Sequence, residues 1–347
     1  MRAQANKHDS LFRIYGEYII YFVFRLIEEA ICLIPKHEHA LGVGRFLGRI
    51  GYIFAWDRKQ VAIDNLTIAF GKDLSQKEIQ ILARKNFEHL GMLGVEFFRL
   101  RRWDHEEIAK RLTINGDANF QIPWSSGPRG VFYIAAHFGS FEVLAAMSRF
   151  LGVKINLVVT PTPNRFINQR MMFRRGGDSS GLRILPHKGI VHRVIAALEA
   201  GEAVVVLADQ RGDDNRPVWV DFFERKVLAN GVFARFAIDG NAYCFPIMGI
   251  RTDDGKYYCE FGDEIPIQIS DNKSDDIMVN SQLFHNIFEQ WLREYPEQGF
   301  WVHRKFKRKR KNRKKQAITY RPSLAQQKSE EPNQRKNNGQ GKVLTQH

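Results

Sequence analysis

The stretch Gly130-Val-Phe-Tyr-Ile-Ala-Ala-His137-Phe-Gly-Ser-Phe-Glu142 decides the fold expected for this chain. An uninterrupted apolar run rich in β-formers ends in a histidine, a short turn follows, and a glutamate comes five residues after the histidine. Such a run predicts a strand buried on both faces, as in a sheet that helices cover on each side. The histidine then lies at the carboxyl end of the strand, where α/β sheets bind their ligands.

Before this segment the pattern is helical to about Leu100, and from Gly130 onward strands and helices alternate. Further strands are predicted at Val153–Thr160, Arg183–Leu185, Ala203–Ala208, Val218–Phe223, Tyr243–Arg251 and Tyr257–Phe261, with helices at Phe141–Leu151, Asn164–Arg175, Ile190–Ala200, Val232–Asp239 and Asp275–Glu294. Thr252-Asp-Asp-Gly255 predicts an antiparallel hairpin, and Ser75-Gln-Lys-Glu78 is a capping box that opens a helix toward Arg99. The predicted fold class is α/β: a single domain with a mixed central sheet flanked by helices, preceded by an N-terminal membrane-associated helical region.

The N-terminal segment, Leu11 to Pro35, is strongly apolar but contains five charged residues. On a helix these charges fall within one arc of roughly 160°, which leaves a wide apolar face. The longest uncharged stretch, Tyr18 to Phe24, is far shorter than the ~20 residues that a span requires. We therefore expect residues 1–38 to form an amphipathic helix lying on the membrane, although a tilted span remains an alternative.

The formal net charge of +14 is concentrated in the C-terminal segment. Arg304 to His347 contains fifteen Lys and Arg residues against two Glu, a net charge of +13. The segment shows no apolar period, which predicts a disordered polybasic tail at 304–347 after a folded body at 39–303. Anionic membrane lipid is the favoured partner of such a tail, a solvated end is the alternative, and nucleic acid is the least favoured partner.

The body of the chain has the composition of a globular protein in a reducing compartment. The apolar content of the whole chain, 44%, suffices for a sizeable core. The three cysteines, Cys32, Cys244 and Cys259, have no spacing typical of a metal site and are expected to be small buried hydrophobes. No metal is expected.

His137 and Glu142 have the residue types of a general base and its carboxylate partner. With Ser140 as N-cap, Glu142 would lie in the first helical turn, where the helix dipole favours an ionised carboxylate. A carboxylate bonded to one ring nitrogen would fix the imidazole tautomer and stabilise the imidazolium formed on proton uptake. The pattern therefore predicts removal of a proton from a hydroxyl. The alternative is a strand-end histidine with a glutamate that only caps a helix.

The segment Ala136-His137-Phe-Gly-Ser-Phe-Glu142 resembles the His-x-x-x-x-Asp/Glu signature of glycerolipid acyltransferases, the lysophospholipid acyltransferase-like superfamily. The wider pattern is similar to its lipid A biosynthesis branch, the lauroyl/myristoyl acyltransferases, over roughly Leu11 to Arg304. Other matching blocks are Asn86-Phe-Glu-His-Leu-Gly91, Asn164 with Arg174 downstream, Leu207-Ala-Asp209-Gln210, Asp221-Phe-Phe223 and Trp291-Leu-Arg-Glu-Tyr-Pro-Glu297 closing on Trp301-Val-His-Arg304.

The resemblance implies acyl transfer from acyl carrier protein to a hydroxyl of a lipid A precursor, at the cytoplasmic face of the inner membrane. His137 would be the catalytic base and Glu142 its assistant. The substrate-binding residues would be Arg174, Asn164, Asp209 and Gln210. No cofactor is implied beyond the acyl donor. Two alternatives stay open: an acyltransferase for another membrane glycolipid or lysophospholipid, and a non-catalytic surface-binding protein that depends on the tail.

Overall fold

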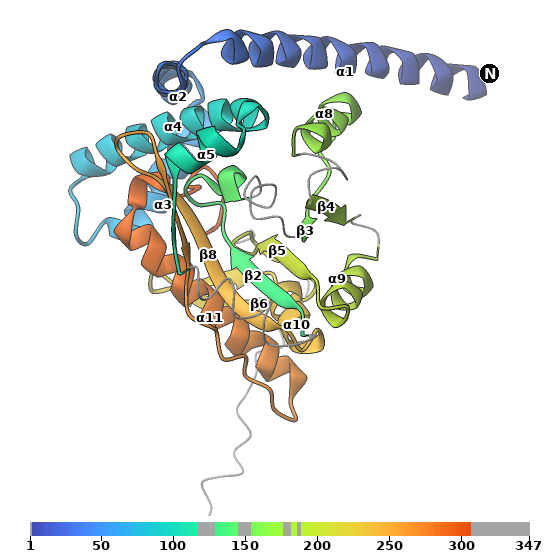
Figure 1. The fold of residues 1–347 in the computed structure, drawn as a ribbon, viewed down its shortest axis with the longest axis vertical. Coiled ribbons are helices and arrows are strands. Elements are labelled where there is room, and N and C mark those ends of the chain that lie inside the picture. Colours follow the sequence, from blue (N-terminus) through green and yellow to red (C-terminus); the bar gives the residue numbers. More distant parts are fainter. Residues whose placement is uncertain (1, 117–128, 145–153, 176–181, 186–188, 307–347) are drawn as a thin grey trace, which may run out of the picture. The chain divides into compact units, whose positions relative to one another are not determined.

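The computed structural model describes residues 2–116, 129–144, 154–175, 182–185 and 189–306 (Figure 1). The chain divides into two units, 1–307 and 308–347, and the second unit lies outside the described residues. The helices are α1 (Arg2–Leu33), α2 (His37–Phe54), α3 (Trp56–Phe70), α4 (Gln76–Arg99), α5 (His105–Arg111), α8 (Arg165–Arg175), α9 (Ile190–Glu199), α10 (Val232–Asp239) and α11 (Lys273–Glu294), with short 3₁₀ turns at Leu100–Arg102 and Pro296–Gln298.

Seven strands of the described residues form one mixed sheet in the order β1-β9-β8-β2-β5-β3-β4. They are β1 (Leu112–Asn115), β2 (Val131–Ala135), β3 (Ile155–Val158), β4 (Leu182–Leu185), β5 (Ala203–Leu207), β8 (Tyr243–Arg251) and β9 (Tyr257–Phe261). The β8–β9 pair is antiparallel and every other pair in the sheet is parallel. Two further strands, β6 (Val218–Phe222) and β7 (Arg225–Ala229), form a separate antiparallel pair.

β2 is buried on both faces, as its apolar run predicts. Phe132 and Ile134 point into the larger core, which includes residues of α9, α10 and α11. Val131, Tyr133 and Ala135 belong to a second core on the other side, built largely from the remaining strands of the sheet. The α/β class with a mixed sheet flanked by helices is therefore confirmed.

Most predicted elements are present within a few residues of their expected bounds, including the 252–255 hairpin and the Ser75–Glu78 capping box. β1 and β7 have no counterpart among the predicted strands. β1 has only four residues, and β7 begins with two exposed basic residues that conceal its apolar end. The predicted helix at Phe141–Leu151 is helical over 141–144, and its remainder lies outside the described residues.

The long N-terminal helix α1 contacts both α4 and α8 (Figure 1). Ile31 and Cys32 pack with Val95 and Phe98 of α4. On the side of α8, the buried Glu28 carboxylate accepts hydrogen bonds from Arg170, at 2.8–3.1 Å. In the described part of the chain, no helix combines the length and apolarity needed to cross a bilayer. Membrane association of residues 1–38 stays a prediction.

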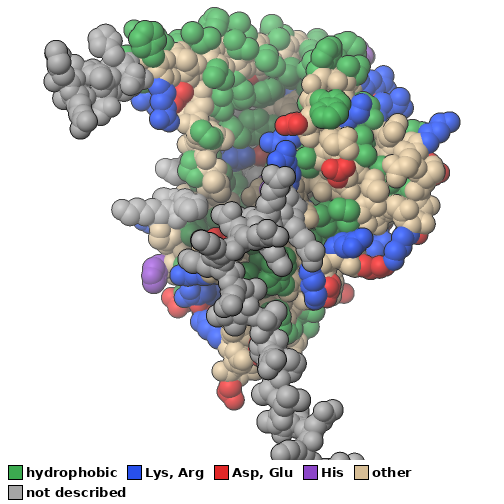
Figure 2. All heavy atoms as spheres, turned by 180° about the vertical axis from the view of Figure 1, so that it is seen from behind, with side chains coloured by type: hydrophobic (Ala, Val, Ile, Leu, Met, Phe, Trp, Pro, Cys, Tyr) green, Lys and Arg blue, Asp and Glu red, His purple; other side chains and the backbone are tan. Residues whose placement is uncertain are grey.

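Large apolar side chains remain exposed on α1 and α2. Phe12 and Ile19 of α1 are 77% and 64% exposed, and Phe46 and Ile53 of α2 are 60% and 64% exposed. Figure 2 shows such side chains gathered along the edge where α1 lies in Figure 1. An apolar surface of this extent normally marks an interaction with membrane or protein.

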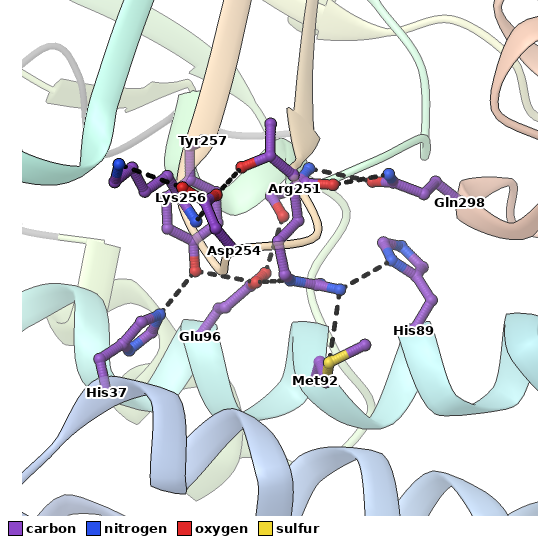
Figure 3. Close-up of polar contacts among 11 residues, drawn as sticks. His37, His89, Met92, Glu96, Arg251, Asp254, Lys256, Tyr257 and Gln298 are labelled. Carbon is purple, nitrogen blue, oxygen red and sulfur yellow. Dashed lines mark hydrogen bonds and ion pairs between the residues drawn. The ribbon is translucent and has the colours of Figure 1, made fainter.

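A buried polar network joins α2, α4, β8 and β9 beneath the turn that follows β2 (Figure 3). Glu96 of α4 is fully buried and forms an ion pair with Arg251 of β8. Tyr257 of β9 donates its hydroxyl hydrogen to Glu96 at 2.9 Å and lies 2.8 Å from Nε2 of His37. Burial, followed by repulsion from Arg111, lowers the pKa of His37 to about 3, so that His37 is a neutral donor to Tyr257.

Helices α2 and α4 approach so closely that glycine is required at their contact. A Cβ at Gly91 of α4 would lie 2.1 Å from the Gly44 carbonyl oxygen and 2.7 Å from the Gly48 nitrogen of α2. A Cβ at Gly94, one turn further along α4, would meet nothing within 4 Å. The two glycines therefore separate the effect of helix packing from that of helix propensity.

We predict that Gly91→Ala lowers the free energy of unfolding and Gly94→Ala raises it. Overpacking a helix contact costs about 1–3 kcal/mol, whereas replacing glycine by alanine within a helix gains up to about 1 kcal/mol. Urea denaturation of the two variants and the wild type measures both effects. A gain of stability in both variants would show that α2 and α4 are less closely packed than described.

Candidate active site

The register of two neighbouring parallel strands brings His137 and Asp209 together. β2 and β5 pair with Ala135 opposite Leu207, and each candidate residue follows its strand by the same number of positions. The Asp209 carboxylate accepts a hydrogen bond from the backbone nitrogen of His137 at 3.0 Å and lies 2.8 Å from its Nδ1. Both side chains are at the carboxyl edge of the sheet, where the sequence predicts the site.

This contact defines the imidazole that can act as a base. A carboxylate only accepts hydrogen bonds, so neutral His137 carries its proton on Nδ1 and presents the lone pair of Nε2. The amide nitrogen of Gln210 lies 3.3 Å from Nε2. The rings of Phe141 and Phe300, with centroids 5.2 Å and 5.4 Å from that of the imidazole, fix its orientation.

The charges around the pair favour an imidazolium beside a carboxylate. Burial would lower the pKa of His137, but Asp209 outweighs it and the pKa is raised above its ordinary value. Burial would likewise raise the pKa of Asp209, yet His137 and then Lys305 hold it well below its usual range. The pair can therefore accept a proton on Nε2 and stabilise the charge that forms.

Glu142 takes a different place from the one expected. Its carboxylate forms a two-point ion pair with Arg175 of α8, at 2.5 Å and 3.1 Å, while Asp209 holds Nδ1 of His137. The expectation that Glu142 is the hydrogen-bonded partner of the imidazole is therefore corrected. Glu142 still raises the pKa of His137 through its charge, against the opposing charge of Arg175.

The turn between His137 and Glu142 is fixed by contacts from several elements. Gly139 has a φ of +58°, and a Cβ there would lie 1.9 Å from the Gly249 carbonyl oxygen of β8. Glycine is therefore required here by the close approach of β8. The Ser140 hydroxyl donates to Glu96 at 3.0 Å, so this serine anchors the turn to the buried network.

An apolar cavity of about 530 Å³ reaches His137. It lies on the face of the sheet to which Tyr133 and Ala135 point. Its polar lining includes Glu142, Arg175, Gln210 and Arg211. The apolar lining includes Tyr133 and Ala135 of β2, Ile155 and Leu157 of β3, Leu182 of β4, Leu207 of β5, Ile247 of β8, Phe261 of β9 and Met171 and Met172 of α8. A cavity of this size and polarity suits a long hydrocarbon chain whose polar end meets the imidazole.

The remaining two predicted site residues belong to α8 or its start. Asn164 accepts hydrogen bonds from the backbone nitrogens of Phe166 and Ile167 and donates to the Glu17 carbonyl oxygen at 2.8 Å. It thus caps α8 and ties it to α1. Arg174 is in α8, but its side chain lies outside what the structure describes.

Arg175 and Lys305 are not among the predicted site residues. The prediction names Arg174, the neighbour of Arg175, and one position along a helix changes the direction of a side chain by about 100°. Lys305 falls within the predicted tail, yet its ammonium group donates to the Asp209 carbonyl oxygen. His137 and Asp209 follow an apolar strand by the same offset, which indicates the same edge of the sheet but not that their two strands are neighbours.

The chain is similar in sequence to two enzymes of lipid A biosynthesis. Over 267 residues the chain is 24% identical to the lipid A biosynthesis palmitoleoyltransferase of Escherichia coli, which covers 76% of this chain and 84% of the relative. It is 26% identical over 271 residues to the lipid A biosynthesis lauroyltransferase of the same species, covering 78% of this chain and 85% of the relative.

Among solved structures, the 1-acyl-sn-glycerophosphate acyltransferase of Thermotoga maritima superposes with a TM-score of 0.36 and 8% identity, over 74% of this chain and 98% of that chain. That likeness carries no argument about the site. The family described as bacterial lipid A biosynthesis acyltransferase matches residues 5–308. The chain therefore belongs to the bacterial lipid A biosynthesis acyltransferase family, and it is an acyltransferase.

Proposed function

We propose that this enzyme transfers a fatty acyl chain from acyl carrier protein to a hydroxyl group of a lipid A precursor, late in lipopolysaccharide biosynthesis. The observation that carries the proposal is the His137–Asp209 pair, whose histidine lines an apolar cavity of about 530 Å³. The pair supplies a base for a hydroxyl and the cavity supplies space for a hydrocarbon chain. Family membership supports an acceptor of the lipid A type.

In the proposed reaction, Nε2 of His137 takes the proton of the acceptor hydroxyl as its oxygen attacks the thioester carbonyl carbon of the donor. The carbon–oxygen bond forms, the carbon–sulfur bond then breaks, and the imidazolium returns the proton to the leaving sulfur. Asp209 holds the ring and balances its charge. No acyl-enzyme intermediate is required.

Other polar groups of the cavity would act on the developing charge. The Glu142–Arg175 pair lies on the cavity wall, and the nitrogen of Arg175 that does not bind Glu142 remains a candidate donor to the thioester oxygen. Glu142 would then assist His137 by its charge and by orienting Arg175. Gln210 would release Nε2 when the acceptor binds. Arg174 and Asn164 remain proposed substrate-binding residues, with Asn164 acting through the position of α8.

We further propose that the enzyme works at the cytoplasmic face of the inner membrane. The exposed apolar side chains of α1 and α2 would enter the lipid interface, and the polybasic segment after residue 303 would bind anionic headgroups. Acyl carrier proteins are acidic, so the same basic segment could recruit the donor. Coenzyme A thioesters are the alternative donor, and another membrane glycolipid or a lysophospholipid is the alternative acceptor.

The proposed reaction is tested with labelled acyl–acyl carrier protein and a lipid A precursor, in detergent. We expect turnover by the wild type and a loss of about 10²–10⁴-fold in kcat for His137→Ala and Asp209→Ala, because each removes the base or its orientation. Glu142→Gln should lose less, because Glu142 does not touch the imidazole.

The controls separate reaction from acceptor. Asp221→Ala changes an exposed ion pair with Lys226 and should keep full activity. Turnover with a lysophospholipid in place of the lipid A precursor would favour the alternative acceptor. Undiminished turnover in both His137→Ala and Asp209→Ala would refute the proposed base.

Membrane binding is predicted to depend on α1. Each of Phe12 and Ile19 should contribute about 1.5–3 kcal/mol on burial in lipid, so the double change to aspartate should weaken binding at least about tenfold. Co-sedimentation with phosphatidylglycerol-containing vesicles measures the effect. Ile269→Asp is the matched control, since Ile269 is 66% exposed outside these helices. Equal sedimentation of the wild type and the double variant would argue against docking through α1.

A further inference from the structure

A lysine at the beginning of the basic C-terminal segment reaches behind the His137–Asp209 pair. The Lys305 ammonium group donates to the backbone carbonyl oxygen of Asp209 and lies 2.9 Å from Nε2 of His285 in α11. With His137, Asp209 and His303 it also lines a small cavity of about 50 Å³. Lys305 thus touches the residue that orients the imidazole, and it is not among the residues that line the large cavity.

The partners of Lys305 are suited to hold a cation without neutralising it. Nδ1 of His285 lies 2.8 Å from the Ser281 carbonyl oxygen, which makes Nδ1 the protonated nitrogen and Nε2 an acceptor for Lys305. Burial, followed by the charge of Lys305, lowers the pKa of His285 to about 3, so His285 is neutral. The ring of Phe222 lies beneath the ammonium group at 5.4 Å.

The positive charge is therefore available to Asp209. Partial burial lowers the pKa of Lys305 to about 8, against the opposing effect of Asp209, and the ammonium form remains predominant at neutral pH. The charge of Lys305 in turn contributes to the low pKa of Asp209. Lys305 thus keeps Asp209 ionised and fixes the backbone from which its carboxylate projects.

We propose that Lys305 is a positioning residue of the acyltransferase site, which acts through Asp209 to hold His137 in place and to extend its action as a base to lower pH. This inference rests on the proposed role of His137 as the base. It makes the first residues of the basic C-terminal segment part of the site, whereas the sequence assigns them to a tail.

The sign of the pH effect follows from the charges that face the imidazole. Asp209 after β5 and Glu142 after β2 favour the imidazolium, whereas Arg175 of α8 disfavours it. Lys305 and the partly buried His303 lie on the C-terminal segment, and His285 on α11 is neutral. When the positive charge of Lys305 is removed, less positive charge counteracts the effect of the Asp209 and Glu142 carboxylates on the imidazole. The pKa of His137 should therefore rise. Activity would then begin at higher pH, because the base must be unprotonated.

The test compares Lys305→Gln, Lys305→Met and Lys305→Arg in the full-length enzyme. In Lys305→Gln the side-chain amide can still donate to the Asp209 carbonyl oxygen but carries no charge. The Gln variant alone is sufficient for the test if the Met variant does not fold. We expect the acid limb of kcat/KM to move up by about one pH unit in the Gln and Met variants. In the Met variant kcat should fall about tenfold with little change in KM. Lys305→Arg should keep the wild-type limb.

A second readout separates this inference from the proposed function. NMR titration of the His137 ring, in protein with isotope-labelled histidine, follows the same pKa without turnover. A raised pKa in Lys305→Gln supports the inference even if lipid A precursors prove not to be substrates. The exposed pair Lys72–Glu224 provides the control Lys72→Met, which should change neither readout. A folded Lys305→Gln variant with an unchanged limb and an unchanged His137 pKa would overturn the proposal.

Discussion

The buried ion pair between Glu96 and Arg251 is the interaction on which the arrangement of this enzyme depends. Glu96 is fully buried, and removing such a charge from water costs several kcal/mol unless its partners are all in place. Those partners come from β8, β9 and the turn after β2, through Arg251, Tyr257 and Ser140. The helices that carry the exposed apolar surface and the turn that carries the site are thereby fixed to one sheet.

The same network continues to the C-terminal side of the molecule. The side chain of Gln298 bonds both the backbone nitrogen and the carbonyl oxygen of Arg251, at 3.0 Å and 2.9 Å. Its own carbonyl oxygen accepts from the Gly139 nitrogen at 2.9 Å. Gln298 lies only a few residues before Lys305 in the sequence. Gln298 therefore anchors both the segment that supports Asp209 and the turn that carries His137. Stability and the geometry of the site are therefore linked.

Much of the fold could be predicted because its signals are local. The uninterrupted apolar run Val131–Ala135 indicates a strand covered on both faces, and Ser75 with Glu78 forms the capping box that its spacing predicts. The edge of the sheet at which His137 lies follows from the same pattern. β1 could not be predicted because it has only four residues, too few to show the alternation of apolar and polar residues that marks a strand.

The partners within the site could not be predicted because they depend on strand order and helix rotation. Placing Asp209 beside His137 requires that β5 be the neighbour of β2, which no spacing in the sequence reveals. Glu142 contacts Arg175 because α8 forms part of the cavity wall. Contacts with α1, such as Glu28–Arg170, hold α8 in this position. These are long-range consequences of packing, beyond the reach of local patterns.

The proposed role of His137 as a base depends on Asp209, and not Glu142, holding its Nδ1. The most direct measurement is NMR of protein with isotope-labelled histidine at neutral pH, which identifies the protonated ring nitrogen of His137 and its hydrogen bond. We expect a hydrogen-bonded Nδ1 proton that disappears in Asp209→Ala and persists in Glu142→Gln. Loss of that proton in Glu142→Gln, with retention in Asp209→Ala, would contradict it.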